Sequence, residues 1–537
     1  MGQAHSATDS AAHADANGST NGHGHGPRKP DGPGRTLKSY APATGELLGE
    51  ARIFDAEAVR KVVDRARAAQ GAWGVLPIEE RCERLLRLRD ALVERSSEIV
   101  DIVSRECGKP RNEALAHELV IVCELITYYC KRAPSILAPE RIDLRLFKHK
   151  SSTVHFVPRG VVGIISPWNY PFSIPMGDVV AALVSGSAAV VKPSEVTPLT
   201  MLKAKEIFDS TGLPEDLFGI VTGDGATGSA LIDSGIQKLI FTGGVETGKK
   251  VAAACGARLI PCVMELGGKA PLIACADCDV ERTAQAIVFG GFANVGQACI
   301  SVERVYAHAS VYDALVARTR ELTQKLRVGD PAKDFFDIGA IIFPKQIEVA
   351  EKHIADAVEK GAIVVTGGKR IAGVGQFFEP TILANCSASM TVMTEEIFGP
   401  IVPFQKVSSE DEAVSLANDS PLGLNAYVFT KNRSRGDAIA RRIEAGSVVV
   451  NDVLINYAVA DAPFGGVKQS GFGRVHGDDA LRDMCERRHV MNDKLPPPKR
   501  DPLWYPYDAA SFHRLATLFR TLYGGKGVLG KISDWFS

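Results

Sequence analysis

Residues 161–165 read V-V-G-I-I, the first of several short apolar runs that alternate with helical patterns. Four similar runs follow, at residues 188–191, 217–221, 238–241 and 259–263. One run and its helix take about twenty to thirty residues, which is the period of a βαβ unit. This rhythm predicts a doubly wound parallel sheet, the layout of a Rossmann-like domain.

A second series of runs has the same rhythm. Its members are residues 271–274, 304–307, 362–365, 401–407, 426–430 and 448–451. Ahead of both series, apolar residues take a helical period from Ala56 onwards, which predicts a helical N-terminal layer. Parts of the segment 142–157 alternate between polar and apolar side chains, which is typical of hairpin strands. The predicted fold class is α/β, with two doubly wound domains.

The composition limits the partners and the compartment. The chain has 537 residues, 45% of them hydrophobic, and a net charge of −1, so no nucleic-acid partner is expected. Eleven cysteines, without the spacing of a disulfide framework, indicate reduced thiols and a cytoplasmic location. The lone C-x-x-C, Cys275 to Cys278, is interpreted as a strand end, and no metal site is predicted.

The N-terminal segment differs in composition from the rest. Residues 1–37 contain almost no large apolar side chains, which predicts a disordered tail. Residues 1–6 match the short pattern for N-myristoylation, which would matter in a eukaryotic cell. The segment lacks the apolar core of a signal peptide, and no apolar run in the chain reaches the length that spans a bilayer.

The C-terminal extension, residues 495–537, contains a predicted amphipathic helix. Its apolar face consists of Phe512, Leu515, Leu518, Phe519 and Leu522. Basic residues lie among them, so peripheral membrane association is one interpretation of the helix. Packing against the protein's own surface or against a sister subunit is the favoured alternative, because most amphipathic helices face a core.

Cys299 is the candidate nucleophile. It lies in F-A-N-V-G-Q-A-C-I-S, residues 292–301, behind Gly296, Gln297 and Ala298. These small or polar residues let a reactant approach closely. The alternative is an inert cysteine packed in the core, the commoner state of a free thiol.

Several glycines and one charged pair are candidates for binding a nucleotide. Gly243 and Gly244 lie between a strand and a helix, where backbone N–H groups meet phosphates, although such turns also serve packing alone. Gly225 and Gly228 open the preceding helix and are expected to face the same crevice. Lys192 and Glu195 follow another strand and suit ribose hydroxyls, with a solvated ion pair as the alternative.

Two further residues are suited to catalysis. Glu265 precedes two glycines at the junction of the two series, where burial would raise its pKa and make it a general base. Asn169 lies between Pro167 and Pro171, which fix the path of the backbone. A fixed amide donor is what a developing oxyanion needs.

Seven motifs in one order and spacing resemble the aldehyde dehydrogenase superfamily, over about Leu37 to Asp493. They are residues 167–171, 192–195, 241–244, 265–269, 292–299, 395–400 and 463–474. The resemblance implies that Cys299 attacks an aldehyde carbonyl, that Asn169 and the Cys299 N–H form the oxyanion hole, and that Glu265 activates water against a thioester. Water rather than coenzyme A is then the acyl acceptor.

The resemblance also implies a nicotinamide cofactor. The matched cofactor positions are Ser166, Pro167, Trp168, Lys192, Glu195, Gly225, Gly228, Gly243, Gly244, Leu266, Glu396 and Phe398. Glu195 favours NAD because its charge repels a ribose 2′-phosphate, and NADP is also allowed. Relatives usually have Ser or Asn where this chain has Gly244, so a side-chain contact to the pyrophosphate is missing.

The implied domain plan has five parts. They are a tail (1–37), an NAD-binding domain (38–141 and 158–266), a catalytic domain (267–476), a bridging segment (142–157 and 477–494) and the C-terminal extension. The bridge is the 142–157 hairpin with a strand near residues 488–491. Its exposed edges are expected to pair between subunits and to give a homodimer or homotetramer.

Apolar residues are expected to surround the substrate. They are Phe172, Ile174, Met176, Val453, Leu454, Ile455 and Tyr457, with Gly177 leaving room. A medium- or long-chain aliphatic or an aromatic aldehyde is the expected substrate, because such walls select on apolar area. Two alternatives are a dehydrogenase that transfers the acyl group to coenzyme A, disfavoured by Glu265, and an idle NAD-binding scaffold, disfavoured by the intact Cys299, Glu265 and Asn169.

Overall fold

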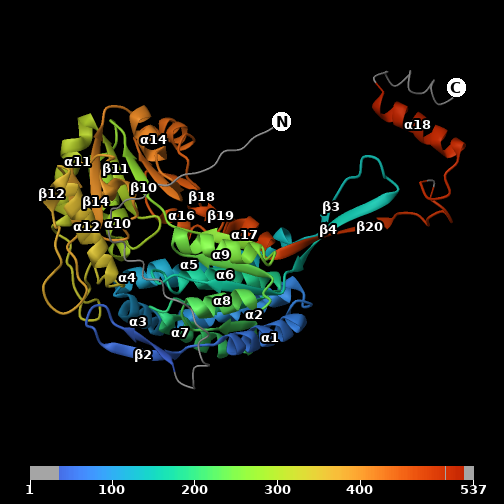
Figure 1. Cartoon of the computed structure of the whole chain (residues 1–537), viewed down its shortest axis with the longest axis horizontal. Helices are drawn as coiled ribbons and strands as arrows, with labels where there is room; N and C mark the ends of the chain where they lie inside the picture. The colour runs from blue at the N-terminus through green and yellow to red at the C-terminus, as the bar shows by residue number, and fades with distance from the viewer. Residues whose placement is uncertain (1–34, 502, 525–537) are drawn as a thin grey trace, which may run out of the picture.

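The computed structural model describes residues 35–501 and 503–524, which form two α/β units and a projecting arm (Figure 1). Each unit is built on one large sheet, and the arm on a three-stranded antiparallel sheet. Each large sheet has its own hydrophobic core, and Leu454 packs against both cores. The α/β fold class is confirmed, while the residue boundaries of the domains stay a prediction.

The first large sheet contains the run at residues 161–165. Its strands, in the order of the sheet, are β19 (Gly471–Phe472), β9 (Cys262–Glu265), β8 (Lys238–Thr242), β5 (Val161–Ile165), β6 (Ala188–Lys192) and β7 (Phe218–Ile220). All are parallel except β19. After β5 the chain adds β6 on one side of β5, and later it adds β8 on the other side of β5. A switch of this kind opens a ligand crevice at the carboxyl ends of the strands.

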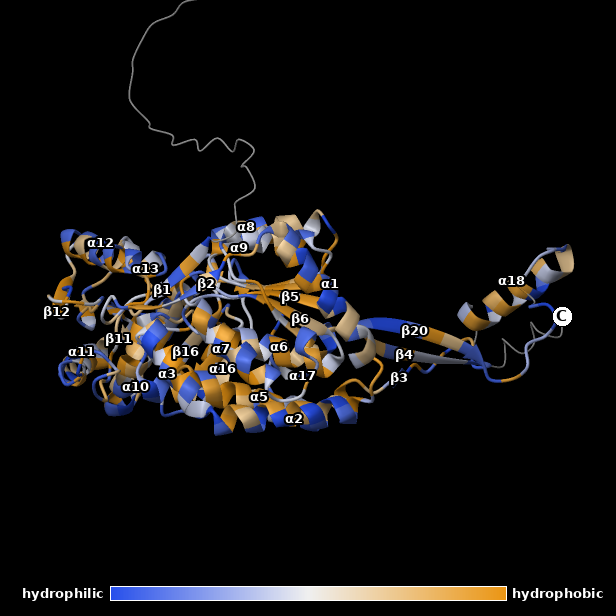
Figure 2. Cartoon of the chain, turned by 90° about the horizontal axis from the view of Figure 1, so that it is seen from below, coloured by the Kyte–Doolittle hydropathy of each residue, from blue (hydrophilic) through white to orange (hydrophobic). Residues whose placement is uncertain are grey.

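Helices cover both faces of this sheet (Figure 2). They are α1 (Ala56–Trp73), α2 (Ile78–Glu94), α3 (Ser96–Cys107), α4 (Arg111–Glu113), the π-helical η1 (Ala114–Leu119), α5 (Val120–Ile136), α6 (Ser173–Ser185), α7 (Pro198–Asp209), η2 (Glu215–Leu217), α8 (Gly225–Asp233), α9 (Val245–Gly256) and α17 (Gly477–Asp483). α6 is buried along its whole length because it lies between the sheet on one side and α2, α5 and α17 on the other. α1 buries Val59, Val62, Val63 and Ala66, the helical face predicted from the sequence.

The second large sheet is parallel except at one edge. In order, its strands are β12 (Ile363–Thr366), β13 (Thr381–Ala384), β14 (Ile401–Val407), β11 (Val302–His308), β10 (Ala270–Ala274), β16 (Asn425–Phe429) and β17 (Ser447–Val450). β12 is the antiparallel edge, and β13 is a strand that the sequence analysis missed. Two short strands, β15 (Leu422–Gly423) and β18 (Val467–Lys468), pair separately.

The helices of the second unit and its connecting turns complete the fold. They are α10 (Val280–Phe292), η3 (Ala293–Gly296), α11 (Ala309–Thr323), α12 (Lys345–Glu359), α13 (Thr391–Thr394), α14 (Glu410–Asn418), α15 (Arg433–Ala440) and α16 (Ile455–Ala458). α10 and α11 pack together against β11 and β14. In Figure 2, α12 and α13 lie on the opposite side of this unit.

The arm projects from the first unit and ends in a helix (Figure 1). Its strands are β3 (Glu140–Arg141), β4 (Lys150–Pro158) and β20 (Cys485–Asp493). β20 pairs with β4 along its full length and leaves its other edge unpaired, with its residues exposed after Cys485. The predicted tail helix is present as α18 (Ala509–Tyr523). The prediction that it packs on the protein's own surface is wrong, because the arm holds α18 away from both α/β units.

Three local expectations are corrected. A hairpin of β1 (Thr36–Tyr40) and β2 (Leu47–Arg52) begins inside the segment predicted to be disordered, and residues 1–34 of that segment lie outside the described part. The fifth run starts at Cys262 rather than Leu259, which is 91% exposed in a left-handed turn. In the hairpin at 142–157, only residues from Lys150 onwards form a strand, which pairs with β3.

Candidate active site

Cys299 follows α10 and η3, at the place where the two α/β units meet. Asn294 and Val295 in η3 have φ angles of 50° and 60°, which are costly for residues with a side chain. Gly268 passes so close to this segment that a Cβ there would lie 2.2 Å from the carbonyl oxygen of Cys299. The cysteine therefore lies on a strained turn against which the connection between β9 and β10 packs.

Glu265 reaches the same place from the first unit, since it is the last residue of β9. Glu265, Cys299 and Asn169 line one cavity of about 340 Å³. The other residues of its lining are Pro167, Trp168, Ile174, Thr242, Gly243, Gly244, Leu266, Gly267, Gln346, Val349, Glu396 and Phe398. The structure thus brings the three predicted catalytic residues together with Leu266, Glu396 and Phe398, three of the seven predicted cofactor residues in this lining.

A second cavity of about 340 Å³ shares Cys299 and Ile174 with the first. The rest of its lining is Ala116, His117, Ile121, Tyr170, Phe289, Ala298, Ile300, Asp452, Val453, Leu454, Ile455, Tyr457 and Ala458. Most of these side chains are apolar, and none of the lining residues is Lys or Arg. Cys299 therefore lies between a mixed polar cavity and an apolar one, which we call the apolar tunnel.

A third cavity, of about 430 Å³, shares Pro167, Trp168 and the Thr242–Gly243–Gly244 turn with the first. It lies at the carboxyl ends of β5, β6 and β8, next to the switch point of the sheet. It is lined by the remaining predicted cofactor residues: Ser166, Pro167, Trp168, Lys192, Glu195, Gly225, Gly228, Gly243 and Gly244. The two cavities together form a continuous groove that ends at Cys299.

The groove fits a dinucleotide at the N-terminus of α9. No side chain caps this helix, and a Cβ added at Gly244 would meet nothing within 4 Å. Space beside the first N–H groups of α9 is therefore open to an anion. The N-terminus of α8 differs, because Asp224 accepts a hydrogen bond from the Ala226 N–H at 2.8 Å.

The candidate ribose pair is held in a defined position. The Lys192 ammonium donates to the carbonyl oxygens of Pro193 (2.8 Å) and Gly223 (3.0 Å) and lies 3.6 Å from the Glu195 carboxylate. Burial lowers the pKa of Lys192. The Glu195 side chain is about half exposed and lines the third cavity.

The Cys299 side chain is partly buried, and its surroundings disfavour the thiolate. Burial raises the pKa of Cys299 to about 12, and the negative charges of Glu396 and Glu265 act in the same direction. The backbone N–H groups of Cys299 and Ile300 oppose this rise because they favour the thiolate. A proton acceptor close to the sulfur is therefore needed before it reacts as a thiolate.

Glu265 has the properties of such an acceptor. Neither carboxylate oxygen has a hydrogen-bond partner among the described residues, and the side chain is buried. Burial raises the pKa of Glu265 well above its usual range, the nearby Asp178 raises it further, and Arg474 lowers it. A buried carboxyl group without a partner lowers the stability of the fold, so its presence here favours a functional role.

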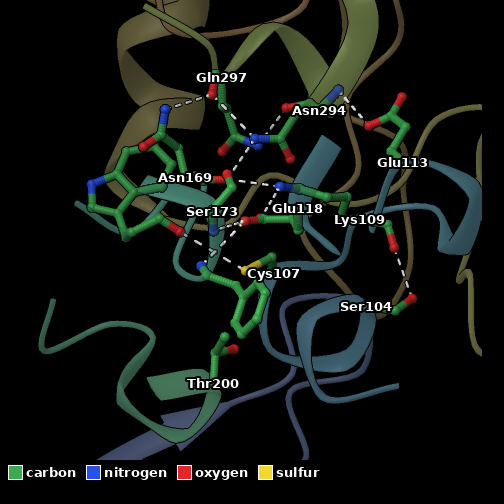
Figure 3. A network of polar contacts seen from close by, with 12 residues as sticks. Ser104, Cys107, Lys109, Glu113, Glu118, Asn169, Ser173, Thr200, Asn294 and Gln297 are labelled. Atoms are coloured by element: carbon green, nitrogen blue, oxygen red, sulfur yellow. Dashed lines mark hydrogen bonds and ion pairs between the residues drawn. The ribbon is translucent and has the colours of Figure 1, made fainter. Parts of the chain in front are cut away.

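Asn169 is fixed by a buried polar network that sequence analysis missed (Figure 3). Its amide Nδ2 donates to the carbonyl oxygen of Gln297 at 3.0 Å, and its Oδ1 has no partner among the described residues. Its own carbonyl oxygen accepts from the Lys109 ammonium (3.0 Å) and from Asn294 Nδ2 (2.9 Å). The amide is thereby attached to the turn that carries Cys299.

An ion pair lies at the centre of this network. Lys109 Nζ is 2.5 Å from Glu118 Oε1, and both side chains are 0% exposed. The second Glu118 oxygen accepts from the backbone N–H groups of Phe172 (3.2 Å) and Ser173 (2.7 Å), at the start of α6. The sequence does not indicate this pairing, because Lys109 and Glu118 are nine positions apart and only the folded chain brings the start of α6 next to them.

The walls of the apolar tunnel agree only in part with expectation. Ile174, Val453, Leu454, Ile455 and Tyr457 line it as expected. Phe172 and Met176 lie in the hydrophobic core instead, and Gly177 leaves no room because Leu125 Cδ1 would lie 3.0 Å from an added Cβ. The cause is the helical period of α6, which points these residues away from Cys299.

One polar residue of the tunnel was also missed. His117 lies in the π-helical η1, packs edge-on against Phe289 and lines the tunnel. Burial lowers the pKa of His117 to about 4, with the charge of Lys109 acting in the same direction, so the imidazole is neutral at neutral pH. π-Helical turns often occur at functional sites.

Comparison with known proteins agrees with this fold and site. The family model described as "Aldehyde dehydrogenase family" matches residues 29–490. The chain therefore belongs to the aldehyde dehydrogenase family, as the resemblance of its motifs implied, and it is an oxidoreductase that acts on aldehydes.

Three relatives illustrate the range of this family. The chain is 35% identical over 497 residues to 4,4'-diapolycopene aldehyde oxidase of a Methylomonas species, covering 92% of each chain. It is 37% identical over 454 residues to a candidate succinate-semialdehyde dehydrogenase of Mycolicibacterium smegmatis that is named for NADP(+), covering 84% of this chain and 88% of the relative. The crystal structure of an aldehyde dehydrogenase of Mycobacterium tuberculosis complexed with NAD+ matches with a TM-score of 0.81 and 32% identity, covering 86% of this chain and 95% of the other.

Proposed function

We propose that the protein oxidises a medium- or long-chain aliphatic or an aromatic aldehyde to the carboxylic acid, with water as the acyl acceptor. The observation that carries this proposal is the position of Cys299 between the apolar tunnel and the groove that fits a dinucleotide. An aldehyde in the tunnel would present its carbonyl carbon to the sulfur from one side. The hydride acceptor would approach from the other side.

Cys299 is the nucleophile of the proposed reaction. Its thiol proton passes to Glu265, directly or through water, and the sulfur then forms a bond to the carbonyl carbon, leaving an oxyanion. Both Glu265 oxygens are without partners among the described residues, so the carboxylate is free to accept this proton. The product of this step is a hemithioacetal anion on Cys299.

Asn169 and the Cys299 backbone N–H are the proposed oxyanion hole. Asn169 Nδ2 carries two hydrogens and uses one in its bond to the Gln297 carbonyl oxygen, so the other is available to the oxyanion. The buried network behind Asn169 fixes this donor before substrate arrives. Preorganised donors of this kind stabilise charge that develops in the transition state.

NAD is the cofactor that the groove is proposed to hold, and when bound it accepts the hydride that leaves the carbonyl carbon. The α9 N-terminus with Gly244 would bind the pyrophosphate, Lys192 and Glu195 the adenine ribose, and Glu396 and Phe398 the nicotinamide end. NADP is also allowed, and the relatives named above include proteins associated with each cofactor. Loss of hydride leaves an acyl thioester on Cys299.

Glu265 releases the thiol proton to solvent once the hemithioacetal has formed, and its carboxylate then takes a proton from water and later returns it to the departing sulfur. The water oxygen then adds to the thioester carbon, the C–S bond breaks, and the acid and the Cys299 thiol are released. The sum is aldehyde, water and oxidised cofactor giving acid, reduced cofactor and a proton. A base at this position favours hydrolysis over transfer to coenzyme A.

The lining of the tunnel separates two classes of aldehyde. Succinate semialdehyde carries a carboxylate, and a buried carboxylate needs a cationic or hydrogen-bonded partner. The tunnel has no Lys or Arg in its lining, His117 is neutral, and Asp452 would repel an anion. These features support an uncharged, apolar substrate.

A homodimer or homotetramer with a cytoplasmic location completes the proposal. The unpaired, exposed edge of β20 supports pairing between subunits, because free strand edges recruit other strands. All eleven cysteines of the chain are free, which supports a reducing compartment. None of the described helices is long and apolar enough to cross a membrane.

An aldehyde panel with each cofactor tests the proposed function. Acetaldehyde, hexanal, decanal, benzaldehyde and succinate semialdehyde are assayed with NAD and with NADP by reduced-cofactor absorbance. Rising kcat/KM from acetaldehyde to decanal supports the proposal. Preference for succinate semialdehyde overturns the substrate class, and a requirement for coenzyme A overturns hydrolysis.

A further inference from the structure

The apolar face of α18 is exposed on the projecting arm. It consists of Phe512, Leu515, Leu518, Phe519, Leu522 and Tyr523. Phe512 is 68% and Phe519 62% exposed, values that are rare for aromatic side chains of a helix this long in a folded protein. The helix is bounded by a capping box at Asp508 and Ser511, so the amphipathic segment has a defined start.

The other face of α18 is basic. Arg514, Arg520 and His513 lie on it or flank it, and the helix contains no Asp or Glu. Its surroundings share this charge: residues 494–537 contain seven Lys and Arg against three Asp, although the whole chain has a net charge of −1. Positive charge is therefore concentrated in the C-terminal extension.

Aromatic residues precede the helix and are also exposed. Trp504, Tyr505 and Tyr507 are more than half exposed, and the two tyrosine rings lie 4.7 Å apart. Tyr and Trp side chains combine an apolar ring with a polar tip and are enriched at the level of lipid headgroups. The extension thus has three features of an interfacial anchor: an apolar helix face, basic flanks and exposed aromatic residues.

The arm places these features where a planar surface would reach them. Figures 1 and 2 show α18 beyond the tip of the β3–β4–β20 sheet, away from both α/β units. Its described polar contact with the arm comes from Arg145, in the loop between β3 and β4, which donates to the Tyr523 hydroxyl at 3.1 Å. The arm therefore holds the helix but does not cover the helix's apolar face.

We propose that the C-terminal extension docks on the surface of a membrane that contains anionic lipids, with α18 lying in the plane of the interface. The charge pattern favours this partner over a second copy of the chain, because every charged side chain of α18 is basic and exposed aromatic residues precede the helix. The proposal does not depend on the identity of the aldehyde. It would also place the enzyme next to the phase in which apolar aldehydes dissolve.

Vesicle flotation of the full chain tests this docking. Vesicles of phosphatidylcholine alone are compared with vesicles containing one third phosphatidylglycerol. We expect the protein to float with the anionic vesicles and to float less at high salt. Each arginine near an anionic surface is worth roughly a fivefold change in partitioning, so Arg514→Gln with Arg520→Gln should lower binding to anionic vesicles by about 25-fold.

Two further double variants give the comparison its controls. Phe512→Ser with Phe519→Ser should abolish flotation on both kinds of vesicle. Lys369→Gln with Arg433→Gln removes two exposed cations from the second α/β unit and should leave flotation unchanged. Activity on a water-soluble aldehyde should be unchanged in every variant, which separates a failure of docking from a failure of the proposed function.

Three results would overturn the proposal. The first is the absence of flotation of the unaltered chain with anionic vesicles, and the second is equal flotation of the chain and the Phe512→Ser, Phe519→Ser variant. The third is a change in oligomeric state of that serine variant in light scattering without vesicles, which would assign α18 to an interface with a second copy.

Discussion

Glu265 and Cys299 come from different α/β units and line one cavity, and neither carboxylate oxygen of Glu265 has a hydrogen-bond partner among the described residues. Each group raises the free energy of ionising the other, because both would be buried anions. The first proton transfer between them therefore leaves one negative charge in the cavity rather than two. Catalysis should depend on which of the two carries the proton.

The pH dependence of turnover follows from this relationship. The pKa of Glu265 lies well above its usual range, so the carboxyl is protonated at low pH and cannot accept a proton from water. We expect kcat to rise with pH until Glu265 is ionised. Because the Cys299 thiol also ionises as pH rises, the acylation burst and the steady-state rate are measured separately from about pH 6 to 10.

Asp178 provides the control for that profile. Its negative charge raises the pKa of Glu265. Asp178→Asn should move the steady-state profile to lower pH by easing the ionisation of Glu265. A profile that stays in place in Asp178→Asn would show that Glu265 does not govern the steady-state rate.

Removing one member of the Lys109–Glu118 pair should affect both stability and catalysis. Glu118→Gln leaves the Lys109 ammonium buried without its counter-charge, which costs about 3–5 kcal/mol of unfolding free energy. The start of α6 and the Asn169 backbone lose their anchor, so kcat should fall while the KM for the cofactor stays similar. Urea unfolding and steady-state kinetics measure the two effects.

Glu246→Gln is the matched control for the ion pair. Glu246 pairs with Lys249 at 2.9 Å, but both side chains are more than half exposed. Its loss should leave the free energy of unfolding nearly unchanged, because solvent screens an exposed pair, and it should leave kcat unchanged. Equal destabilisation by both substitutions would contradict the importance assigned to the buried network.

The chain length of the aldehyde should determine kcat/KM through the apolar tunnel. Each methylene buried there contributes about 0.8 kcal/mol, or roughly a fourfold gain, until the tunnel is filled. Ile455→Lys places a cation in the lining, so it should lower kcat/KM for decanal and raise it for succinate semialdehyde. No response of either substrate to Ile455→Lys would mean that the aldehyde does not occupy this tunnel.

Gly244→Ser tests the unusual residue of the phosphate turn. Gly244 has an ordinary φ of −70°, no side chain caps α9, and an added Cβ meets nothing within 4 Å. Serine should therefore fit, cap the helix and give the pyrophosphate another donor, with a lower KM for NAD and a gain in stability of only about 0.3 kcal/mol, because glycine is itself a tolerated N-cap. A higher KM for NAD would place the pyrophosphate elsewhere.

The sequence predicted features that are fixed by local patterns. The run at residues 161–165 is a buried strand because apolar residues continue without a break. Cys299, Glu265 and Asn169 were candidates because glycines and prolines surround them and because their motifs resemble one family, and the three residues line one cavity. β13 was missed because Thr381–Ala384 is only four residues long, and the β1–β2 hairpin because it is polar. Such segments depend on neighbours that are distant in the chain.

Long-range contacts account for most of what the sequence did not predict. Lys109 and Glu118 lie in a helical layer, yet their partners Asn169 and Ser173 come from the connection between β5 and α6. The sequence predicts free space at Gly177 because glycine has no side chain, but Leu125 from α5 fills that space. Periodicity predicts which face of a helix is buried, but only the folded structure shows which residue packs against that face.

The most direct test of the account is the mass of the Glu265→Gln protein after one turnover with decanal and NAD. Glu265→Gln removes both the acceptor of the thiol proton and the base for water, so acylation should need a prolonged incubation, but an acyl group that has formed should persist. The denatured protein should then gain the mass of a decanoyl group on Cys299 together with one equivalent of reduced cofactor. Cys299→Ala should show neither. Reduced cofactor without an acyl adduct on Cys299, or turnover at the normal rate in Glu265→Gln, would contradict the proposed roles of these two residues.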